Sequence, residues 1–130
     1  MIIVLDSNEY IHHLNKNISL DKLFSSQNLD ICINDAIIRE VINNLTDSQT
    51  KEFYNIVFNK NIEFYGEKLP SALLEDFKKA GLKKGDIAIA AFCKHIKADY
   101  LITENRHFLK SKKLEKIKVL SLKGFLKKLG

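Results

Sequence analysis

The segment Ile2-Ile3-Val4-Leu5-Asp6-Ser7-Asn8, next to the N-terminus, decides how the fold is interpreted. Its four consecutive aliphatic residues do not alternate with polar ones, which predicts a short strand buried on both faces, as in parallel sheets. An acid follows this strand directly, and a helical pattern begins behind it. The rest of the chain repeats the same order of buried strand, polar residue and helix.

Four more segments carry the signature of short strands. They lie at about residues 29–33, 62–65, 100–103 and 117–120. The helical patterns between them comprise two short pieces within residues 7–27, a helix capped by Asp35, a capping-box helix from Thr46 to about Lys60, a helix from Ser71 to Gly81, a buried central helix around residues 87–93 and a basic helix over residues 122–129. This alternation predicts a three-layer α/β/α sandwich with a mainly parallel central sheet, built by residues 1–130 as one domain.

Composition indicates a cytoplasmic protein. A chain of 130 residues, 45% of them hydrophobic, suits one compact core. The longest apolar run, residues 87–93, has seven residues, well below the roughly 20 that a membrane helix needs. Cys32 and Cys93 lie 61 positions apart among apolar neighbours. They are therefore predicted to be buried free thiols in a reducing compartment rather than a disulfide or a zinc site.

The net charge of +5 is distributed unevenly along the chain. Residues 109–130 carry eight lysines and one acid, whereas the remaining 108 residues have a charge of −2. An acidic body with a basic C-terminal segment suggests contact with nucleic acid or with an acidic partner. The alternative is that these lysines form the solvated face of a terminal helix, so charge alone supports nucleic-acid binding only weakly.

Polar residues lie just past the predicted strands. Asp6 ends the first strand, Asn34 and Asp35 follow the second, and Asn105 follows the strand at residues 100–103. Because parallel strands end at one edge of a sheet, these side chains are expected to meet there, together with Asp86 at a helix start. Converging carboxylates repel each other unless a cation lies between them, and oxygen ligands suit Mg²⁺ or Mn²⁺.

Each candidate also has a purely structural alternative. Asp6 and Asp86 could cap helices, and Asn105 could be a turn residue. Glu40 is the weakest candidate, since the helical period places it about 130° from the centre of the apolar face. Periodicity alone therefore does not select Glu40.

Four segments resemble, in order, the motifs of PIN-domain nucleases. Ile3-Val4-Leu5-Asp6-Ser7-Asn8 resembles their opening strand and turn, and Ile38-Arg39-Glu40-Val41 resembles their second acidic motif. Lys84-Gly85-Asp86-Ile87-Ala88-Ile89-Ala90-Ala91 is similar to the third motif, in which an Asp opens an alanine-rich helix. Leu101-Ile102-Thr103-Glu104-Asn105-Arg106-His107-Phe108 resembles the fourth. The resemblance spans roughly residues 2 to 125.

The resemblance implies metal-dependent hydrolysis of phosphodiester bonds, with RNA as the substrate. Asp6, Glu40, Asp86 and Asn105 would be the catalytic residues that hold Mg²⁺ or Mn²⁺. Ser7 would hydrogen-bond a carboxylate or the phosphate. Arg106 and the lysines of residues 110–128 would hold the RNA strand. Many family members have Asp where this chain has Asn105, which weakens a second metal position in particular.

A small PIN domain without an appended module resembles the VapC-like toxins of prokaryotic toxin–antitoxin pairs. That resemblance implies a homodimer and an antitoxin protein that covers the acidic site. One alternative is a PIN-like domain that binds RNA or protein without cleaving it. A receiver-like phosphoacceptor is a third interpretation, but the second acid that such a protein would have near the first strand is absent.

Overall fold

A computed structural model describes residues 1–60, 62–109, 114 and 116–129, and its centre is a parallel β-sheet. Within these residues the sheet has five strands in the order β3-β2-β1-β4-β5, and every neighbouring pair is parallel. The strands are β1 (Ile2–Leu5), β2 (Asp30–Asn34), β3 (Ile62–Tyr65), β4 (Tyr100–Ile102) and β5 (Lys118–Leu120). The prediction of a mainly parallel sheet is confirmed.

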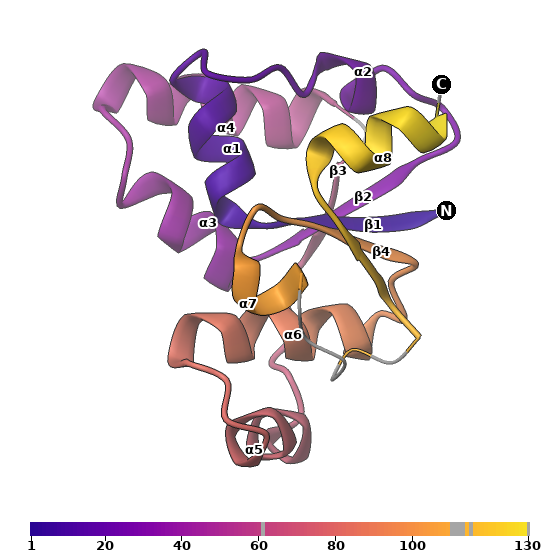
Figure 1. Ribbon diagram of the computed structural model, residues 1–130. Coiled ribbons are helices and arrows are strands. Elements are labelled where there is room, and N and C mark those ends of the chain that lie inside the picture. Colours follow the sequence, from indigo (N-terminus) through magenta and orange to yellow (C-terminus); the bar gives the residue numbers. More distant parts are fainter. Residues whose placement is uncertain (61, 110–113, 115, 130) are drawn as a thin grey trace.

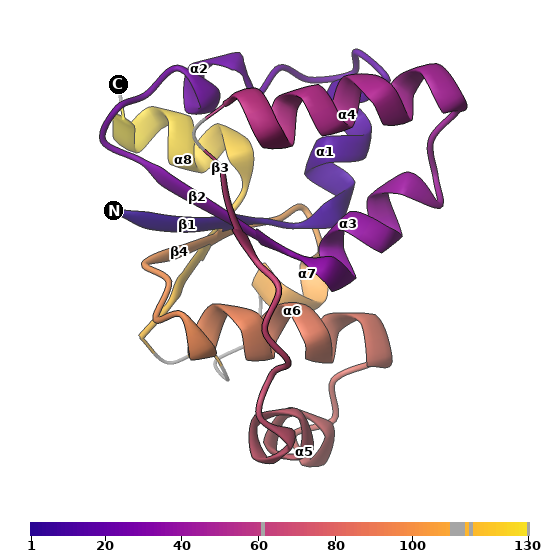
Figure 2. The same cartoon turned by 180° about the vertical axis from the view of Figure 1, so that it is seen from behind.

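Helices cover both faces of the sheet. They are α1 (Ser7–Leu14), α2 (Asp21–Phe24), α3 (Asp35–Ile42), α4 (Asp47–Asn59), α5 (Ser71–Lys79), α6 (Lys84–His95), α7 (Arg106–Leu109) and α8 (Leu122–Leu129). Figures 1 and 2 show α1, α2, α4 and α8 on one side of the sheet and α6 on the other, with α5 packed against α6. The expected α/β/α sandwich is therefore the observed architecture.

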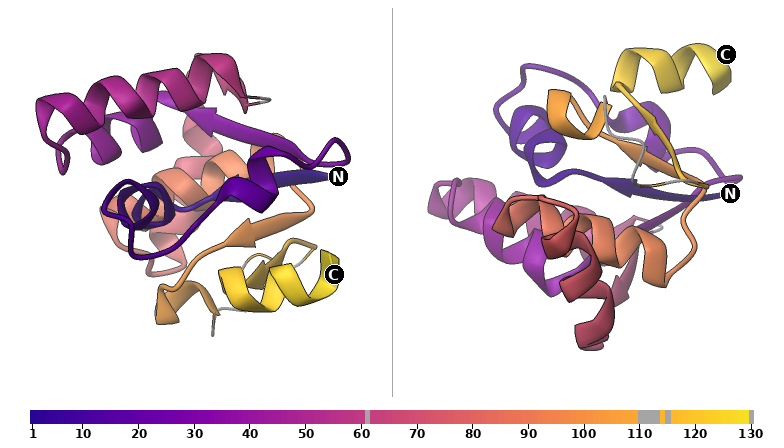
Figure 3. Two further views of the ribbon diagram at one scale, coloured as in Figure 1. Left: turned by 90° about the horizontal axis from the view of Figure 1, so that it is seen from above. Right: turned by 60° about the horizontal axis from the view of Figure 1, so that its bottom comes forward.

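The central position of β1 determines where the site lies. Val4 is in register with Cys32 of β2 on one side and with Leu101 of β4 on the other. The N–H of Asp6 continues this ladder by donating to the carbonyl of Ile102 at 3.0 Å. In both views of Figure 3 the N-terminus lies at one end of the sheet and the helix that follows β1 at the other. Asp6 therefore lies at the edge where the parallel strands end.

The helix starts confirm one predicted cap and correct another. The side chains of Thr46 and Gln49 form the expected capping box at the start of α4. The predicted cap of α3 was wrong: Asn34, not Asp35, is the N-cap, and its side chain accepts from the N–H of Ile37. Adjacent Asn and Asp residues are equally suited to capping, and only the observed end of β2 decides between them.

Aliphatic and aromatic side chains fill the space between the sheet and its helices. The most deeply buried large side chains include Tyr10 of α1, Phe53 of α4 and Phe92 of α6. Cys32 and Cys93 are buried free thiols, as predicted. Burial raises the pKa of Cys32 to about 11, so this thiol is held in its neutral form. Among the helices that the structure describes, none is long and apolar enough to span a membrane.

Candidate functional site

The candidate site lies where β1 and β4 end and α6 begins. Figure 1 shows the starts of α1 and α6 at the same end of the sheet. Because all strands are parallel, residues from distant parts of the sequence meet at this edge. The edge brings together Asp6, Asp86 and Asn105, three of the four residues predicted to hold a metal ion.

Asp6 is a buried carboxylate held by two hydroxyl groups. Its Oδ2 accepts a hydrogen bond of 2.7 Å from Oγ1 of Thr103, and its Oδ1 accepts one of 3.2 Å from Oγ of Ser7. Asp6 occupies the N-cap position of α1, but its side chain makes no capping hydrogen bond. Helix capping therefore does not explain why the carboxylate of Asp6 is buried, with 4% of the residue exposed. The hydroxyl groups of Ser7 and Thr103 orient this carboxylate, but they carry no positive charge that would neutralise it.

Asp86 lies in the first turn of α6 rather than at its N-cap. The N-cap of α6 is Lys83, and Asp86 is the third helical residue. Burial and the charge of Asp6 raise the pKa of Asp86, while His107, Lys83 and the hydrogen bond from Asn105 act in the opposite direction. The influence of Asp6 on this pKa indicates that the two carboxylates share one electrostatic environment.

Asn105 has both a structural role and a role in the site. Its Oδ1 accepts from the N–H of His107 at 2.9 Å, which is the turn role anticipated as an alternative. Its Nδ2 donates to Oδ1 of Asp86 at 3.3 Å, and its backbone N–H donates to Oγ1 of Thr103 at 3.0 Å. Asn105 is thus connected to Asp86 directly and to Asp6 through Thr103.

Glu40 does not join this group in the structure. It lies exposed on α3, where its backbone carbonyl accepts from Nδ2 of Asn44 at 2.8 Å. Among the described residues, no three His, Cys, Asp or Glu side chains are arranged to hold one metal ion. The helix that carries Glu40 does pack against α6, which carries Asp86. Glu40 therefore lies on a helix that neighbours the helix of Asp86, and its side chain is exposed.

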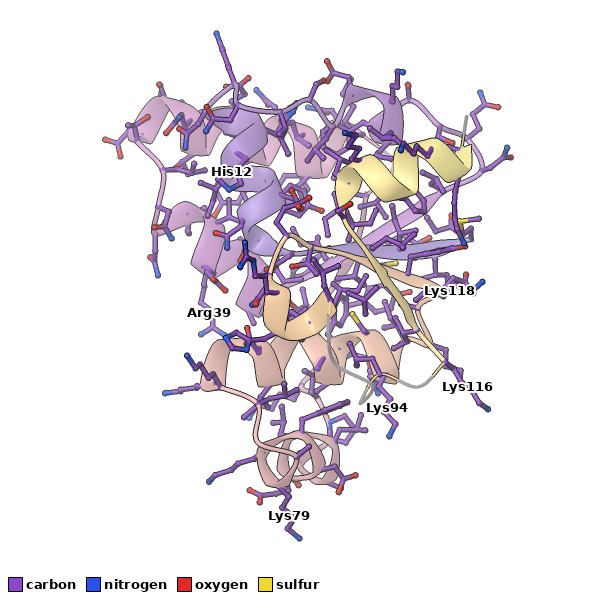
Figure 4. All side chains as sticks on the ribbon, in the orientation of Figure 1. His12, Arg39, Lys79, Lys94, Lys116 and Lys118 are labelled. Atoms are coloured by element: carbon purple, nitrogen blue, oxygen red, sulfur yellow. The ribbon has the colours of Figure 1, made fainter. Side chains whose placement is uncertain are left out.

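The basic residues do not all lie near the acids. Arg106 is exposed at the start of α7, directly after Asn105. Lys116 precedes β5 and Lys118 is its first residue, so both lie at the edge where the strands begin, opposite the candidate site. Figure 4 shows them away from Arg39. Residues 110–113 and 115 of the lysine-rich segment lie outside the described residues. Lys123, at the start of α8, is the described lysine of this segment that lies at the edge where the strands end.

One residue of the site and one buried acid near it escaped the sequence analysis. Thr103 is fully buried, and its hydroxyl group links Asp6 to Asn105. Glu9 of α1 is 1% exposed, and its burial, together with the charges of Glu104 and Asp6, raises its pKa to about 7. An acid in the first turn of a helix normally complements the helix dipole from the surface, so nothing in the local pattern indicates that Glu9 is buried.

The raised pKa of Glu9 predicts a dependence of stability on pH. A carboxyl group whose folded pKa lies above its unfolded value of 4.5 stabilises the protein below pH 4.5, and this stabilisation is lost as the pH rises towards 7. In EDTA, the free energy of unfolding should therefore fall between pH 4.5 and 7, by up to about 3 kcal/mol from this group. Urea denaturation of the wild type and of Glu9→Gln measures the difference. Parallel pH profiles for the two proteins would contradict the assignment.

The oxygen donors at this edge fit a hard divalent cation. Asp6 and Asp86 offer carboxylate oxygens, Asn105 offers an amide, and no thiolate or imidazole is needed. Burial, and after it the charge of Asp6, raises the pKa of Asp86, and a cation held by both carboxylates would offset both effects. Mg²⁺ commonly uses one or two carboxylates and keeps several water ligands, which suits this donor set.

Comparison with solved structures identifies the fold. No protein-family model matches the sequence, and no curated protein matches it significantly. VapBC2 from Rickettsia felis, solved with a DNA fragment from its promoter, superposes with a TM-score of 0.64 at 19% identity over 92% of this chain and 97% of that chain. The PIN-domain endonuclease Utp24 superposes with a TM-score of 0.62 at 16% identity, over 93% of this chain and 84% of that chain. The PIN domain of T. brucei RRP44 superposes with a TM-score of 0.63 at 11% identity, over 98% of this chain and 81% of that chain. The chain has the PIN-domain fold that the VapBC2 structure also contains.

Proposed function

We propose that this protein is a metal-dependent endoribonuclease and the toxin component of a toxin–antitoxin pair. The observation that carries the proposal is the Asp6–Thr103–Asn105–Asp86 chain of hydrogen bonds at the edge where the strands end. It holds two carboxylates and an amide in one electrostatic environment. The structural likeness to VapBC2 and to the endonuclease Utp24 supports the same reaction class.

The proposed ligands of Mg²⁺ or Mn²⁺ are Asp6, Asp86 and Asn105, with Glu40 joining from α3. A bound divalent ion lowers the pKa of its water and neutralises charge on the phosphate during hydrolysis. Ser7 and Thr103 keep the Asp6 carboxylate oriented, because each donates a hydroxyl hydrogen to one of its oxygens. Ser7 is fully buried, which favours the hydrogen bond to Asp6 over a direct contact with the phosphate. Arg106 is exposed and adjoins Asn105, and we propose that it attracts an RNA phosphate.

The partners in this proposal are RNA, a second copy of the chain and an antitoxin. The acids at the site repel RNA, so substrate binding requires basic residues at the same edge, and Arg106 and Lys123 are the described candidates. An antitoxin that supplies a basic side chain to Asp6 and Asp86 would compete with the metal ion. Copurification from native cells with a small partner protein would support the toxin role, and repeated recovery of the chain alone would count against it.

The neutral side chain of Asn105 favours a second candidate function, RNA or protein binding without cleavage. Exposed Glu40, away from the other acids, favours the same alternative. The two functions differ in one outcome. A binding module would retain RNA affinity when Asp6 is replaced by Asn and would produce no new RNA ends.

Mapping of 5′-phosphate ends on total cellular RNA tests the nuclease function. Purified protein is incubated with the RNA and Mg²⁺ or Mn²⁺, beside reactions that contain EDTA or the Asp6→Asn variant. The proposal predicts new 5′-phosphate ends at a restricted set of sites in the first reaction alone. Total RNA is the correct substrate, because a selective nuclease can ignore a generic one. Ends that persist in EDTA, or their complete absence at both metals, would reject the proposed function.

Replacement of Asn105 by Asp should strengthen metal binding and weaken the metal-free protein. The added carboxylate offers charge to the ion, but it abolishes the donation from Nδ2 to Asp86 and places two like charges side by side. In EDTA we expect a loss of about 1–3 kcal/mol of unfolding free energy, and in Mg²⁺ a tighter dissociation constant. Calorimetry and thermal melts measure both. An unchanged Mg²⁺ affinity would place Asn105 outside the metal site.

A further inference from the structure

A groove lies between α8 and the segment that follows α1, beside the candidate site. It has a volume of about 440 Å³, within the roughly 300–1,000 Å³ of pockets that bind small molecules. Figure 1 shows α8 on the same side of the sheet as α1. The groove is lined by three apolar side chains, two lysines and one acid: Ile18, Leu122, Leu126, Lys123, Lys127 and Glu104. Neither the fold nor the proposed metal ligands account for this combination of side chains.

Glu104 connects this groove to the proposed metal site. It stands between Thr103 and Asn105, the two residues that donate hydrogen bonds to the acids of that site. Its Oε1 accepts from the N–H of Leu122 at 3.1 Å, which holds the carboxylate at the start of α8. In the part of the chain that the structure describes, no group donates to its Oε2. An RNA strand with a phosphate at the metal site would therefore place a neighbouring nucleotide beside Glu104.

The two lysines of the groove suit an anionic ligand. Lys123 and Lys127 are exposed and lie one turn apart on α8, next to Leu122 and Leu126. Lys127 lies in the last turn and complements the helix dipole, whereas Lys123 lies in the first turn, where the dipole disfavours a cation. Neither lysine forms an ion pair with another described residue. This surplus of positive charge beside a metal site favours an RNA strand over an apolar protein segment.

We propose that this groove binds one base of the RNA substrate and selects a base with an exocyclic amino group over uracil. The inference rests on the proposed action on RNA. The apolar side chains contact the base, the two lysines contact flanking phosphates, and the carboxylate of Glu104 accepts from the amino group. A carboxylate accepts hydrogen bonds but cannot donate them, and Glu side chains select cytosine by accepting from its N4 amino group. Uracil has a carbonyl oxygen at the equivalent position, which the carboxylate repels.

RNA affinity in the absence of cleavage tests this selection. In EDTA, fluorescence anisotropy should show that the protein binds a short single-stranded RNA of cytosines at least about fivefold tighter than one of uracils. Glu104→Gln should shift the preference towards uracil, because its Oε1 can still accept from Leu122 while its Nε2 can donate to a carbonyl oxygen. Lys123→Gln and Lys127→Gln should weaken the binding of both RNAs equally, since phosphate contacts carry no sequence information. Glu52→Gln, which removes an exposed acid of α4, is the matched control and should change neither affinity.

The mapped cleavage sites give a second readout. The wild type should favour an amino-bearing base at one position near the cut, and Glu104→Gln should lose that preference. If Glu104→Gln does not fold, Ile18→Ser replaces it, because the loss of this apolar wall should also reduce the preference. Equal affinity of the wild type for both RNAs, or an unchanged preference in the variant, would overturn the inference and leave the groove to a protein partner. A preference that depends on Glu104 in a protein that produces no new RNA ends would instead reject the proposed nuclease function alone.

Discussion

Replacement of Asp6 by Asn is expected to reduce RNA cleavage by on the order of 10³-fold while the protein remains folded. The substitution removes the negative charge of Asp6 at the end of the central strand β1 and leaves the shape of the side chain nearly unchanged. Ser7 and Thr103 both carry hydroxyl groups, which can accept as well as donate, so the new amide finds hydrogen-bond partners in place. Initial rates on an RNA that carries a mapped cleavage site measure the effect.

The control for this prediction is another buried acid close to the site. Glu9→Gln removes a carboxylate from the same region but leaves the bonds of Asp6 to Ser7 and Thr103 intact, so it should lower the rate much less. Circular dichroism should show the same fold for both variants. If Asp6→Asn cleaves at more than about a tenth of the wild-type rate, metal-assisted catalysis at Asp6 is contradicted.

Replacement of Thr103 by Val should be the most destabilising conservative change at the site. The hydroxyl group donates to Asp6 and accepts from the backbone N–H of Asn105, and the residue is fully buried. Valine has nearly the same shape but makes neither bond, so a buried carboxylate and a backbone donor both lose a partner. We expect a loss of about 2–4 kcal/mol in the free energy of unfolding, because hydrogen bonds to charged groups are worth about 1.5–3 kcal/mol and neutral ones less.

Thr103→Ser distinguishes the hydroxyl group from the methyl group in this prediction. Serine retains both hydrogen bonds and loses one methyl group, so it should cost about 1 kcal/mol or less and should keep the Mg²⁺ affinity of the wild type. Urea denaturation and calorimetry on the two variants give the comparison. A serine variant as unstable as the valine variant would show that packing, rather than the bond to Asp6, is the role of Thr103.

The sheet and most of its helices could be predicted because their signals are local. Unbroken apolar runs marked β1 and β4, and the Thr46–Gln49 pair marked the start of α4. The choice of Asn34 over Asp35 as a cap could not be made, since it depends on the residue at which β2 ends. Local patterns thus define elements well and their boundaries less well.

The site was predictable only in part, for a related reason. Asp6, Asp86 and Asn105 could be selected because each lies just past a strand or near a helix start. Thr103 and Glu9 could not be selected. Thr103 depends on a hydrogen bond to Asp6, 97 positions away, and Glu9 on its burial and on the charge of Glu104, 95 positions away. Glu40 was selected by resemblance alone, and it is the predicted ligand that the structure leaves exposed.

The central claim is that Asp6 and Asp86 bind one divalent metal ion, and the most direct test is the anomalous scattering of Mn²⁺ in crystals of the protein. We predict an anomalous peak at roughly 2.0–2.3 Å from a carboxylate oxygen of each residue, as is normal for Mg²⁺-type sites. The same map would show whether the side chain of Glu40 reaches the ion from α3. A map of Mn²⁺-saturated crystals without a peak between Asp6 and Asp86 would contradict the assignment of this edge as a metal-dependent nuclease centre.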